Sequence, residues 1–212
     1  MRAHDERDKD LVRDAYDAIY ARYEAWDDDA VDDVRQHVLD RALELVPSRT
    51  RALDLGCGTG TKITRRLASS FDRLTAVDLS PRSIDAARVN LPDVELRAGD
   101  MTTIDLAPSA FDLVAAFFSI IHVPADEQPP LFDRIAGWLA PGGIFAANFG
   151  GAAGDQREEF LGAPMFWSAL APDATVAAIE RSGLDVLDQE IDERMEHGAP
   201  VRFLWVTARR PT

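Results

Sequence analysis

Residues 52–60 read Ala52-Leu53-Asp54-Leu55-Gly56-Cys57-Gly58-Thr59-Gly60, and no other part of the chain constrains the architecture as strongly. A short apolar strand, 51–55, runs into three glycines at alternate positions and then into a helix that begins at Thr61. Glycine has no Cβ, so bare backbone can approach a ligand where a side chain would collide. The stretch predicts a strand, a ligand-binding loop and a helix.

The second predicted strand, 74–78, ends in Asp78, whose carboxylate can accept hydrogen bonds from both hydroxyls of a ribose. A nucleoside is therefore the expected ligand. The glycines are spaced G-x-G-x-G, whereas the dinucleotide fingerprint is G-x-G-x-x-G, and the chain lacks the G-x-x-x-x-G-K-[ST] loop of nucleotide hydrolases. The alternative is a tight strand-to-helix turn in another kind of α/β protein.

Strands and helices alternate along the chain, which predicts a doubly wound parallel sheet with its ligand at the carboxyl ends of the strands. Two helices, 11–22 and 31–45, precede the first strand, and Ser80-Pro81 is a typical helix start. A last helix, 174–182, and an antiparallel hairpin follow. The expected strands are 51–55, 74–78, 94–97, 111–118, 144–148, 184–194 and 201–208, with helices at 61–68, 81–90 and 127–139 and a helix stop at 141–143.

The string D-L-G-C-G-T-G resembles motif I of the class I S-adenosylmethionine-dependent methyltransferases, and the resemblance covers about Tyr16 to the C-terminus. It implies one α/β domain over residues 1–212 with a Rossmann-like sheet of seven strands, in the order 3-2-1-4-5-7-6 and with the last strand antiparallel. Residues 1–47 would form N-terminal cap helices. Residues 150–172, glycine-rich at their start, would form a lid-like insertion.

The same resemblance implies which residues hold S-adenosylmethionine. Asp54 faces the ammonium group, Asp78 binds the ribose diol, and Asp100 accepts from the adenine amino group. Each acid also has another interpretation: Asp54 as a helix cap, Asp78 as a turn residue and Asp100 as an Asx turn. The remaining cofactor-binding residues are expected to be Gly56, Gly58 and Gly60 at the methionine moiety, Leu79 and Met101 on the adenine faces, Phe117 and Ser119 near the methyl group, and Tyr16 and Tyr23 over the methionine end. The tyrosines could instead form the buried face of an amphipathic helix.

His122 is the best-placed candidate for a general base, because it follows the fourth strand and imidazole titrates near neutrality. The alternative is a histidine that packs in its loop or bonds to backbone. His197 is expected in a solvated hairpin turn. Met165, Phe166 and Trp167 are expected to bind the substrate from the lid; the alternative is a surface loop whose aromatic side chains pack back onto the core.

Composition excludes several classes of function. Hydrophobic residues make up 46% of the chain and charged residues 28%, as in ordinary globular proteins, and the net charge is −14. Such acidity disfavours nucleic acid as a partner, and the sequence predicts neither a membrane segment nor a secretory signal, hence a cytoplasmic protein. Cys57, the single cysteine, excludes an intrachain disulfide. No acidic cluster suggests a metal site, and Phe203, Leu204 and Trp205 could pair two subunits at the sheet edge.

The leading hypothesis is methyl transfer from S-adenosylmethionine to an oxygen or nitrogen of a small molecule. The alternatives are a related enzyme diverted to cyclisation or decarboxylation, and a non-catalytic module that only binds the cofactor. A nicotinamide oxidoreductase is disfavoured by the glycine spacing and by Asp100.

Overall fold

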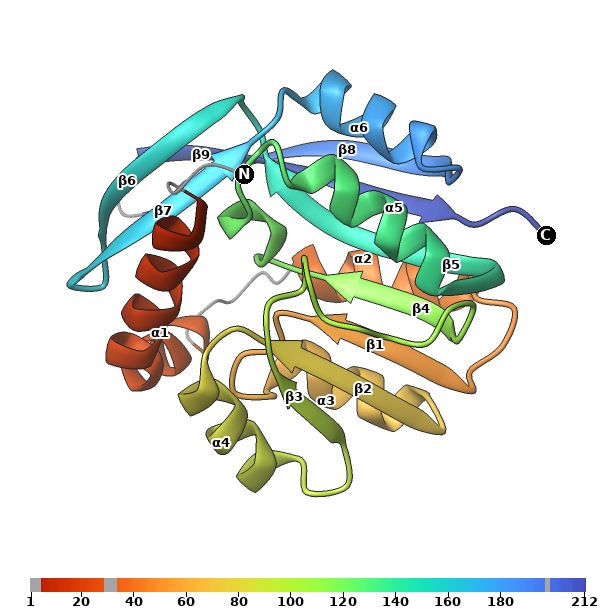
Figure 1. Cartoon of the computed structure of the whole chain (residues 1–212), viewed down its shortest axis with the longest axis horizontal. Helices are drawn as coiled ribbons and strands as arrows, with labels where there is room; N and C mark the ends of the chain where they lie inside the picture. Colours follow the sequence, from red (N-terminus) through yellow and green to blue (C-terminus); the bar gives the residue numbers. More distant parts are fainter. Residues whose placement is uncertain (1–4, 29–33, 197–198) are drawn as a thin grey trace.

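The computed structural model describes residues 5–28, 34–196 and 199–212. A seven-stranded sheet in the order β3-β2-β1-β4-β5-β9-β8 forms its centre (Figure 1). The first five strands run parallel, and β9 is antiparallel to both of its neighbours. The predicted order is thus confirmed, since β8 and β9 are the sixth and seventh strands of this sheet. The strands are β1 (Arg51–Leu55), β2 (Arg73–Asp78), β3 (Glu95–Ala98), β4 (Phe111–Ala116), β5 (Leu139–Gly150), β8 (Asp185–Glu196) and β9 (Ala199–Arg209).

Helices cover both faces of the sheet, as expected of a doubly wound fold. On one face lie α2 (Val34–Leu45), α3 (Lys62–Ser70) and α4 (Pro81–Asn90), which bury Leu39, Leu67 and Ile84 in one hydrophobic cluster. On the other face lie α5 (Gln128–Trp138) and α6 (Pro172–Arg181), which bury Phe132 and Ile179 in a second cluster.

The helix start predicted at Ser80 is confirmed in detail. The Ser80 side chain accepts a hydrogen bond from the Ser83 backbone N–H at 3.0 Å, and Pro81 occupies the first turn, where its missing N–H leaves no bond unmade. This cap fixes the direction in which the chain leaves β2.

Several boundaries differ from the prediction, and those at the end of α5 and the end of β4 have a clear physical reason. The helix stop expected at 141–143 already lies in β5, because α5 ends at Trp138 and the strand begins at Leu139. Gly143 permits this close pairing: a Cβ there would lie 2.9 Å from the carbonyl oxygen of Phe111. In addition, β4 ends at Ala116, since Phe118 takes a positive φ of 53° that cannot continue a strand.

A third layer lies across the carboxyl ends of the parallel strands (Figure 1). It consists of α1 (Asp5–Asp28) and a hairpin of β6 (Gly154–Phe160) and β7 (Ala163–Ala169). Buried side chains of α1 and β7 form a separate hydrophobic cluster, made of Val12, Ala15, Ile19, Ala163, Met165 and Phe166. The segment expected as a glycine-rich lid is therefore a regular hairpin packed on a helix, and whether it moves stays a prediction.

Some expected features fall outside the described residues. They are His197 and Gly198 in the predicted hairpin turn and the first residues, 31–33, of the predicted second helix.

Candidate functional site

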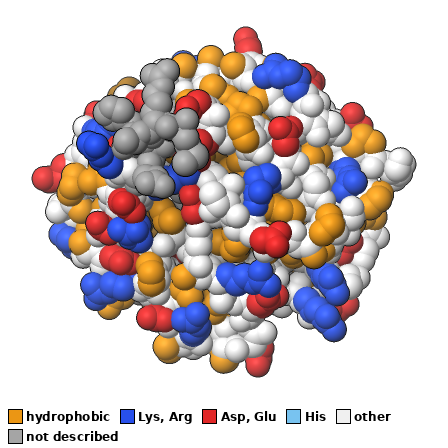
Figure 2. Space-filling model, viewed as in Figure 1, with side chains coloured by type: hydrophobic (Ala, Val, Ile, Leu, Met, Phe, Trp, Pro, Cys, Tyr) orange, Lys and Arg blue, Asp and Glu red, His pale blue; other side chains and the backbone are white. Residues whose placement is uncertain are grey.

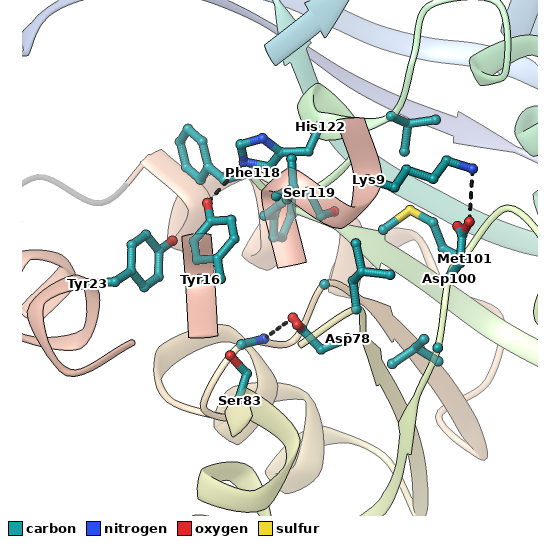
Figure 3. A pocket seen from close by; sticks show the side chains of 18 of the residues that line it. Lys9, Tyr16, Tyr23, Asp78, Ser83, Asp100, Met101, Phe118, Ser119 and His122 are labelled. Atoms are coloured by element: carbon teal, nitrogen blue, oxygen red, sulfur yellow. Dashed lines mark hydrogen bonds and ion pairs between the residues drawn. The ribbon is translucent and has the colours of Figure 1, made fainter. Parts of the chain in front are cut away.

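A cavity of about 830 Å³, including its open mouth, lies between the strand ends and the third layer. Its sheet wall is built from the segments that follow β1 to β4, and its cap wall from α1 (Figure 3). The residues that line it are Lys9, Val12, Tyr16, Tyr20, Tyr23, Gly56, Gly58, Thr59, Val77, Asp78, Leu79, Ser83, Gly99, Asp100, Met101, Phe117, Phe118, Ser119, His122 and Val123.

The glycine loop is bound tightly to its neighbours. Gly56 donates its backbone N–H to Val77 at 2.7 Å, and a Cβ on Gly56 would lie 2.2 Å from Cβ of Ser119. Its φ of 88° is also a conformation that glycine adopts without strain. Only glycine therefore allows β1 and β4 to end this close together. Gly56 and Gly58 line the cavity, whereas Gly60 is absent from its lining and packs toward α4, where a Cβ would lie 3.0 Å from Leu91 Cδ1.

Asp78 links the loop to the next helix. One carboxylate oxygen accepts from the Gly58 backbone N–H at 2.8 Å, and the other from the Ser80 backbone N–H at 2.9 Å. Burial raises the pKa of Asp78 above its usual value, although these hydrogen bonds act in the opposite direction. Asp78 is thus both a turn residue and a cavity residue. Each oxygen keeps accepting capacity for a hydroxyl donor.

Asp54 does not line the main cavity but a smaller one that adjoins it, with Gly56, Gly58 and Phe117 lining both. Thr64 Oγ1 donates to its carboxylate at 2.7 Å, and burial raises the pKa of Asp54 to about 7. Arg35 and Lys62 line the same smaller cavity, as does Tyr23, which also lines the larger one. This end of the site therefore offers a carboxylate and two cationic side chains, which complement a zwitterion.

Asp100 and Met101 line the opposite end of the main cavity. One Asp100 oxygen accepts from the Thr102 backbone N–H at 2.8 Å, the Asx turn of the alternative interpretation. The other oxygen accepts from Lys9 Nζ at 2.8 Å (Figure 3). Lys9 also pairs with Glu127. Lys9 therefore ties α1 to this end of the sheet wall.

Phe117, Phe118 and Ser119 form the turn after β4, between the two ends of the cavity. Asn148 Oδ1 accepts from the Phe118 backbone N–H at 2.6 Å and so supports its positive φ. The Ser119 hydroxyl is buried without a recorded hydrogen-bond partner among the described residues.

His122 follows this turn, and its ring bridges α1 and β7. Nε2 lies 3.0 Å from Tyr16 Oη (Figure 3). Nδ1 lies 2.6 Å from the backbone carbonyl oxygen of Phe166. Burial lowers the pKa of His122 to about 4, and the bond to Phe166 opposes this shift less strongly. His122 is therefore a neutral imidazole at pH 7, with both nitrogens in hydrogen bonds. This geometry corresponds to the alternative interpretation of His122, a histidine that bonds to backbone, and not to the general base.

Met165, Phe166 and Trp167, which were expected to bind the substrate, lie behind the cap wall. Met165 and Phe166 are fully buried against α1, so neither lines the cavity. The Trp167 ring packs 6.0 Å from the His122 ring and 5.9 Å from the Phe160 ring, measured between centroids, and is also absent from the lining. The contribution of this segment to the site is the Phe166 carbonyl.

Sequence reasoning missed Lys9 and Tyr20 as residues of the site. Lys9 and Tyr20 could have been found by extending the helical repeat of α1, because residues 9, 12, 16, 20 and 23 follow the three- and four-residue spacing of one helix face. Phe118 adjoins the predicted Phe117, and its ring lies under the guanidinium of Arg35 at 5.5 Å and that of Arg194 at 5.2 Å.

In the described ranges, no helix is long and apolar enough to cross a membrane, and no group of three or more His, Cys, Asp or Glu side chains could hold a metal ion. Figure 2 shows Lys and Arg side chains interspersed with Asp and Glu on the face viewed.

Residues 52–143, from β1 into β5, match the family described as the methyltransferase domain. These residues therefore form a methyltransferase domain. The fold is that of solved S-adenosylmethionine-dependent methyltransferases. A solved structure with the same fold is the N-methyltransferase NodS from Bradyrhizobium japonicum in complex with S-adenosyl-L-homocysteine. It has a TM-score of 0.71 and 18% identity, over 95% of this chain and 100% of that one.

Curated relatives share more of the sequence over a shorter span. A trans-aconitate 2-methyltransferase from Variovorax paradoxus is 34% identical over 67% of this chain. The dTDP-3-amino-3,6-dideoxy-alpha-D-glucopyranose N,N-dimethyltransferase from Streptomyces fradiae is 32% identical over 46% of it. The chain spans 51% of the length of the first relative and 38% of the second.

Proposed function

We propose that this methyltransferase moves a methyl group from S-adenosylmethionine to an oxygen or nitrogen of a small molecule. The observation that carries the proposal is the order of groups along one cavity. The glycine loop, Asp78 and Asp100 follow β1, β2 and β3, so their order matches the methionine, ribose and adenine parts of one extended nucleoside.

Asp78 is suited to the ribose diol because its two oxygens are held by separate backbone N–H groups and still have room to accept. Leu79 and Met101 offer apolar contacts for adenine, and Asp100 offers an acceptor for the amino group. Asp54 would accept from the ammonium group, and Arg35 or Lys62 would donate to the carboxylate of the methionine end. Charge-assisted hydrogen bonds of this kind contribute about 1.5–3 kcal/mol each.

When bound, the cofactor supplies an electrophilic methyl group, so the residues have to position the acceptor rather than activate the methyl. Tyr16, Phe117 and Phe118 enclose the middle of the cavity, where the acceptor would meet the methyl group. A compact cavity under a helix favours a small acceptor over a polymer.

A second candidate keeps the cofactor and changes the reaction to a cyclisation or a decarboxylation. The two functions differ in their products. Methyl transfer yields one S-adenosylhomocysteine for each methylated product, whereas the diverted reaction yields none. A module without catalysis would bind the cofactor and convert no substrate.

The first experiment is thermal unfolding with S-adenosylmethionine, S-adenosylhomocysteine and NADH in turn. Ligand at 100 times its dissociation constant adds about 2.7 kcal/mol, which raises the unfolding temperature by several degrees at this chain length. Stabilisation by both sulfur nucleosides supports the proposal. Stabilisation by NADH alone, or by none of the three, would refute it.

The other expectations from the sequence stay predictions. They are a cytoplasmic location, a reaction without metal, no nucleic-acid partner, and a homodimer paired through β8 and β9.

A further inference from the structure

Two hydrogen bonds of His122 determine where the hydrogen of the Tyr16 hydroxyl lies. Nδ1 is 2.6 Å from the Phe166 carbonyl oxygen, which can only accept, so Nδ1 carries a hydrogen. In the neutral imidazole Nε2 then has none. Tyr16 Oη, 3.0 Å from Nε2, therefore donates its hydrogen to His122.

The surroundings of the ring keep it neutral. His122 is buried among α1, β7 and the turn after β4, and burial lowers its pKa to about 4. Among the described residues, Tyr16 is the titratable side chain that contacts the ring, and the pKa of His122 is set by burial and by the bond to the Phe166 carbonyl. The assignment of the hydrogens thus holds at neutral pH.

Tyr16 also lines the cavity beside Phe118 and Ser119 (Figure 3). Since its own hydrogen is committed to His122, its oxygen offers lone pairs to a ligand. A carboxylate acceptor would place its lone pairs against those of Tyr16. A hydroxyl acceptor could donate, but it must lose its proton as the new bond forms, and His122 is a poor base. An amine can donate one N–H and still attack with its lone pair.

Building on the methyltransferase function above, we propose that the methyl acceptor is an amine that donates an N–H to Tyr16 Oη, and that His122 is the positioning residue that holds Tyr16 as an acceptor. A cationic acceptor first loses a proton to water, and the lone pair of the neutral amine nitrogen then forms a bond to the methyl carbon. The methyl–sulfur bond breaks with its electron pair left on sulfur, and the resulting ammonium product loses a proton to water. The step needs no base from the protein.

The charge of the chain agrees with this acceptor. Free amines are cationic near neutral pH, and a net charge of −14 attracts cations and repels carboxylates. The proposed acceptor thus differs from trans-aconitate, after which one relative is named, and resembles the amino sugar in the name of the other.

The tautomer can be observed directly by ¹⁵N NMR of histidine-labelled protein in complex with S-adenosylhomocysteine. The chain has four histidines, so His122→Gln identifies the signal, and His37→Gln, on the exposed side of α2, is the matched control. We expect the neutral Nδ1–H form of His122 from about pH 8 to about pH 5, with its Nε2 signal displaced in Tyr16→Phe. Titration near the usual histidine value, or the Nε2–H form, would overturn the positioning role.

The acceptor class is tested with three matched probes: benzylamine, benzyl alcohol and benzoate. We expect benzylamine alone to raise the unfolding temperature of the S-adenosylhomocysteine complex and to be methylated from S-adenosylmethionine at mildly alkaline pH. Tyr16→Phe should lower that rate about tenfold, the loss of one hydrogen bond, and leave cofactor affinity within about threefold. Greater stabilisation or methylation with benzoate or benzyl alcohol, or no effect of benzylamine, would overturn the proposal.

Two further variants test positioning. The His122→Gln side chain can still accept from Tyr16, so it should retain more activity than His122→Leu; equal loss would contradict the role. A measurement of cofactor binding distinguishes failure of this proposal from failure of the proposed methyltransferase function. Failure to bind S-adenosylhomocysteine would refute the methyltransferase function, whereas binding with the wrong tautomer or acceptor would refute only the present inference.

Discussion

The sheet wall and the cap wall of the cavity are held together by different kinds of contact. In the sheet wall, backbone groups bond to one another or to an adjacent acid, as Gly56 does to Val77 and Gly58 to Asp78. The cap wall depends on side chains from distant parts of the chain, such as Lys9 with Asp100. The proposed cofactor site is therefore built into the strand ends, while the proposed acceptor site depends on how α1 docks.

The largest effect is expected in the sheet wall, from Gly56→Ala. The new Cβ would lie 2.2 Å from Ser119 Cβ, at a φ of 88° that alanine rarely adopts. The free energy of unfolding should fall by about 3 kcal/mol or more, measured by urea unfolding. Gly137→Ala is the matched control, because its Cβ meets nothing within 4 Å in α5, and it should stabilise by up to about 1 kcal/mol. Similar stability of the two variants would contradict this account of the loop.

The next effect is the pH dependence of stability, to which Asp54 and His122 contribute with opposite signs. Folding raises the pKa of Asp54 to about 7 and lowers that of His122 to about 4. As the pH falls from 6.5 to 4, the unfolded state binds a proton at His122 and the folded state does not, so His122 lowers the free energy of unfolding. As the pH falls from 7 to 3.8, the folded state binds a proton at Asp54 before the unfolded state does, so Asp54 raises the free energy of unfolding. Each changes unfolding free energy by at most about 1.4 kcal/mol per pH unit.

Urea unfolding at pH 7 and pH 5 of two variants separates these terms. His122→Gln should lose less stability on acidification than the unmodified protein, and Asp54→Asn should lose more. Identical pH dependence of all three proteins would show that neither group is buried as described.

A smaller effect is expected when Lys9→Met releases α1 from the end of the cavity that Asp100 lines. Lys9 is 15% exposed and Asp100 24% in their side chains, so the ion pair is partly shielded from water. Unfolding free energy should fall by about 1–2 kcal/mol, read from thermal unfolding. Arg13→Met removes a more exposed ion pair of the same helix and should change stability by less than about 0.5 kcal/mol. Equal effects would mean that Lys9 does not anchor the cap wall.

The smallest effect concerns the contact between α1 and β6. Arg157 donates to both oxygens of Asp8, at 2.8 and 2.7 Å, but its side chain is 51% exposed. Arg157→Met should therefore lower stability by less than about 1 kcal/mol. Limited proteolysis should still cut the hairpin faster than in the unmodified protein, and an unchanged cleavage rate would show that this pair does not hold it.

The sheet wall was predictable because its signals are local in sequence. Arg51–Leu55 forms β1 with the predicted bounds, and Ser80 caps the helix that follows β2. For Asp78 and Asp100 the two competing interpretations turned out to be compatible, since each side chain closes a turn and lines the cavity.

The cap wall was less predictable because its partners are distant. The polar segment 154–160 has no strand-like alternation and becomes a strand by pairing with β7. Met165 and Phe166 suggested substrate contacts, since nothing in the sequence shows that α1 covers them. Tyr16 and His122 meet across 106 positions of chain, so neither sequence segment alone indicates the hydrogen bond.

The central claim is that Asp78 binds the ribose of an S-adenosyl nucleoside in this cavity, and calorimetric titration with S-adenosylhomocysteine tests it most directly. The unmodified protein should bind, and so should Asp85→Ala, which removes an exposed acid of the neighbouring helix α4. Asp78→Ala should bind about tenfold or more weakly, because it removes a charge-assisted hydrogen bond. No binding to the unmodified protein, or equal affinity in all three, would contradict the claim.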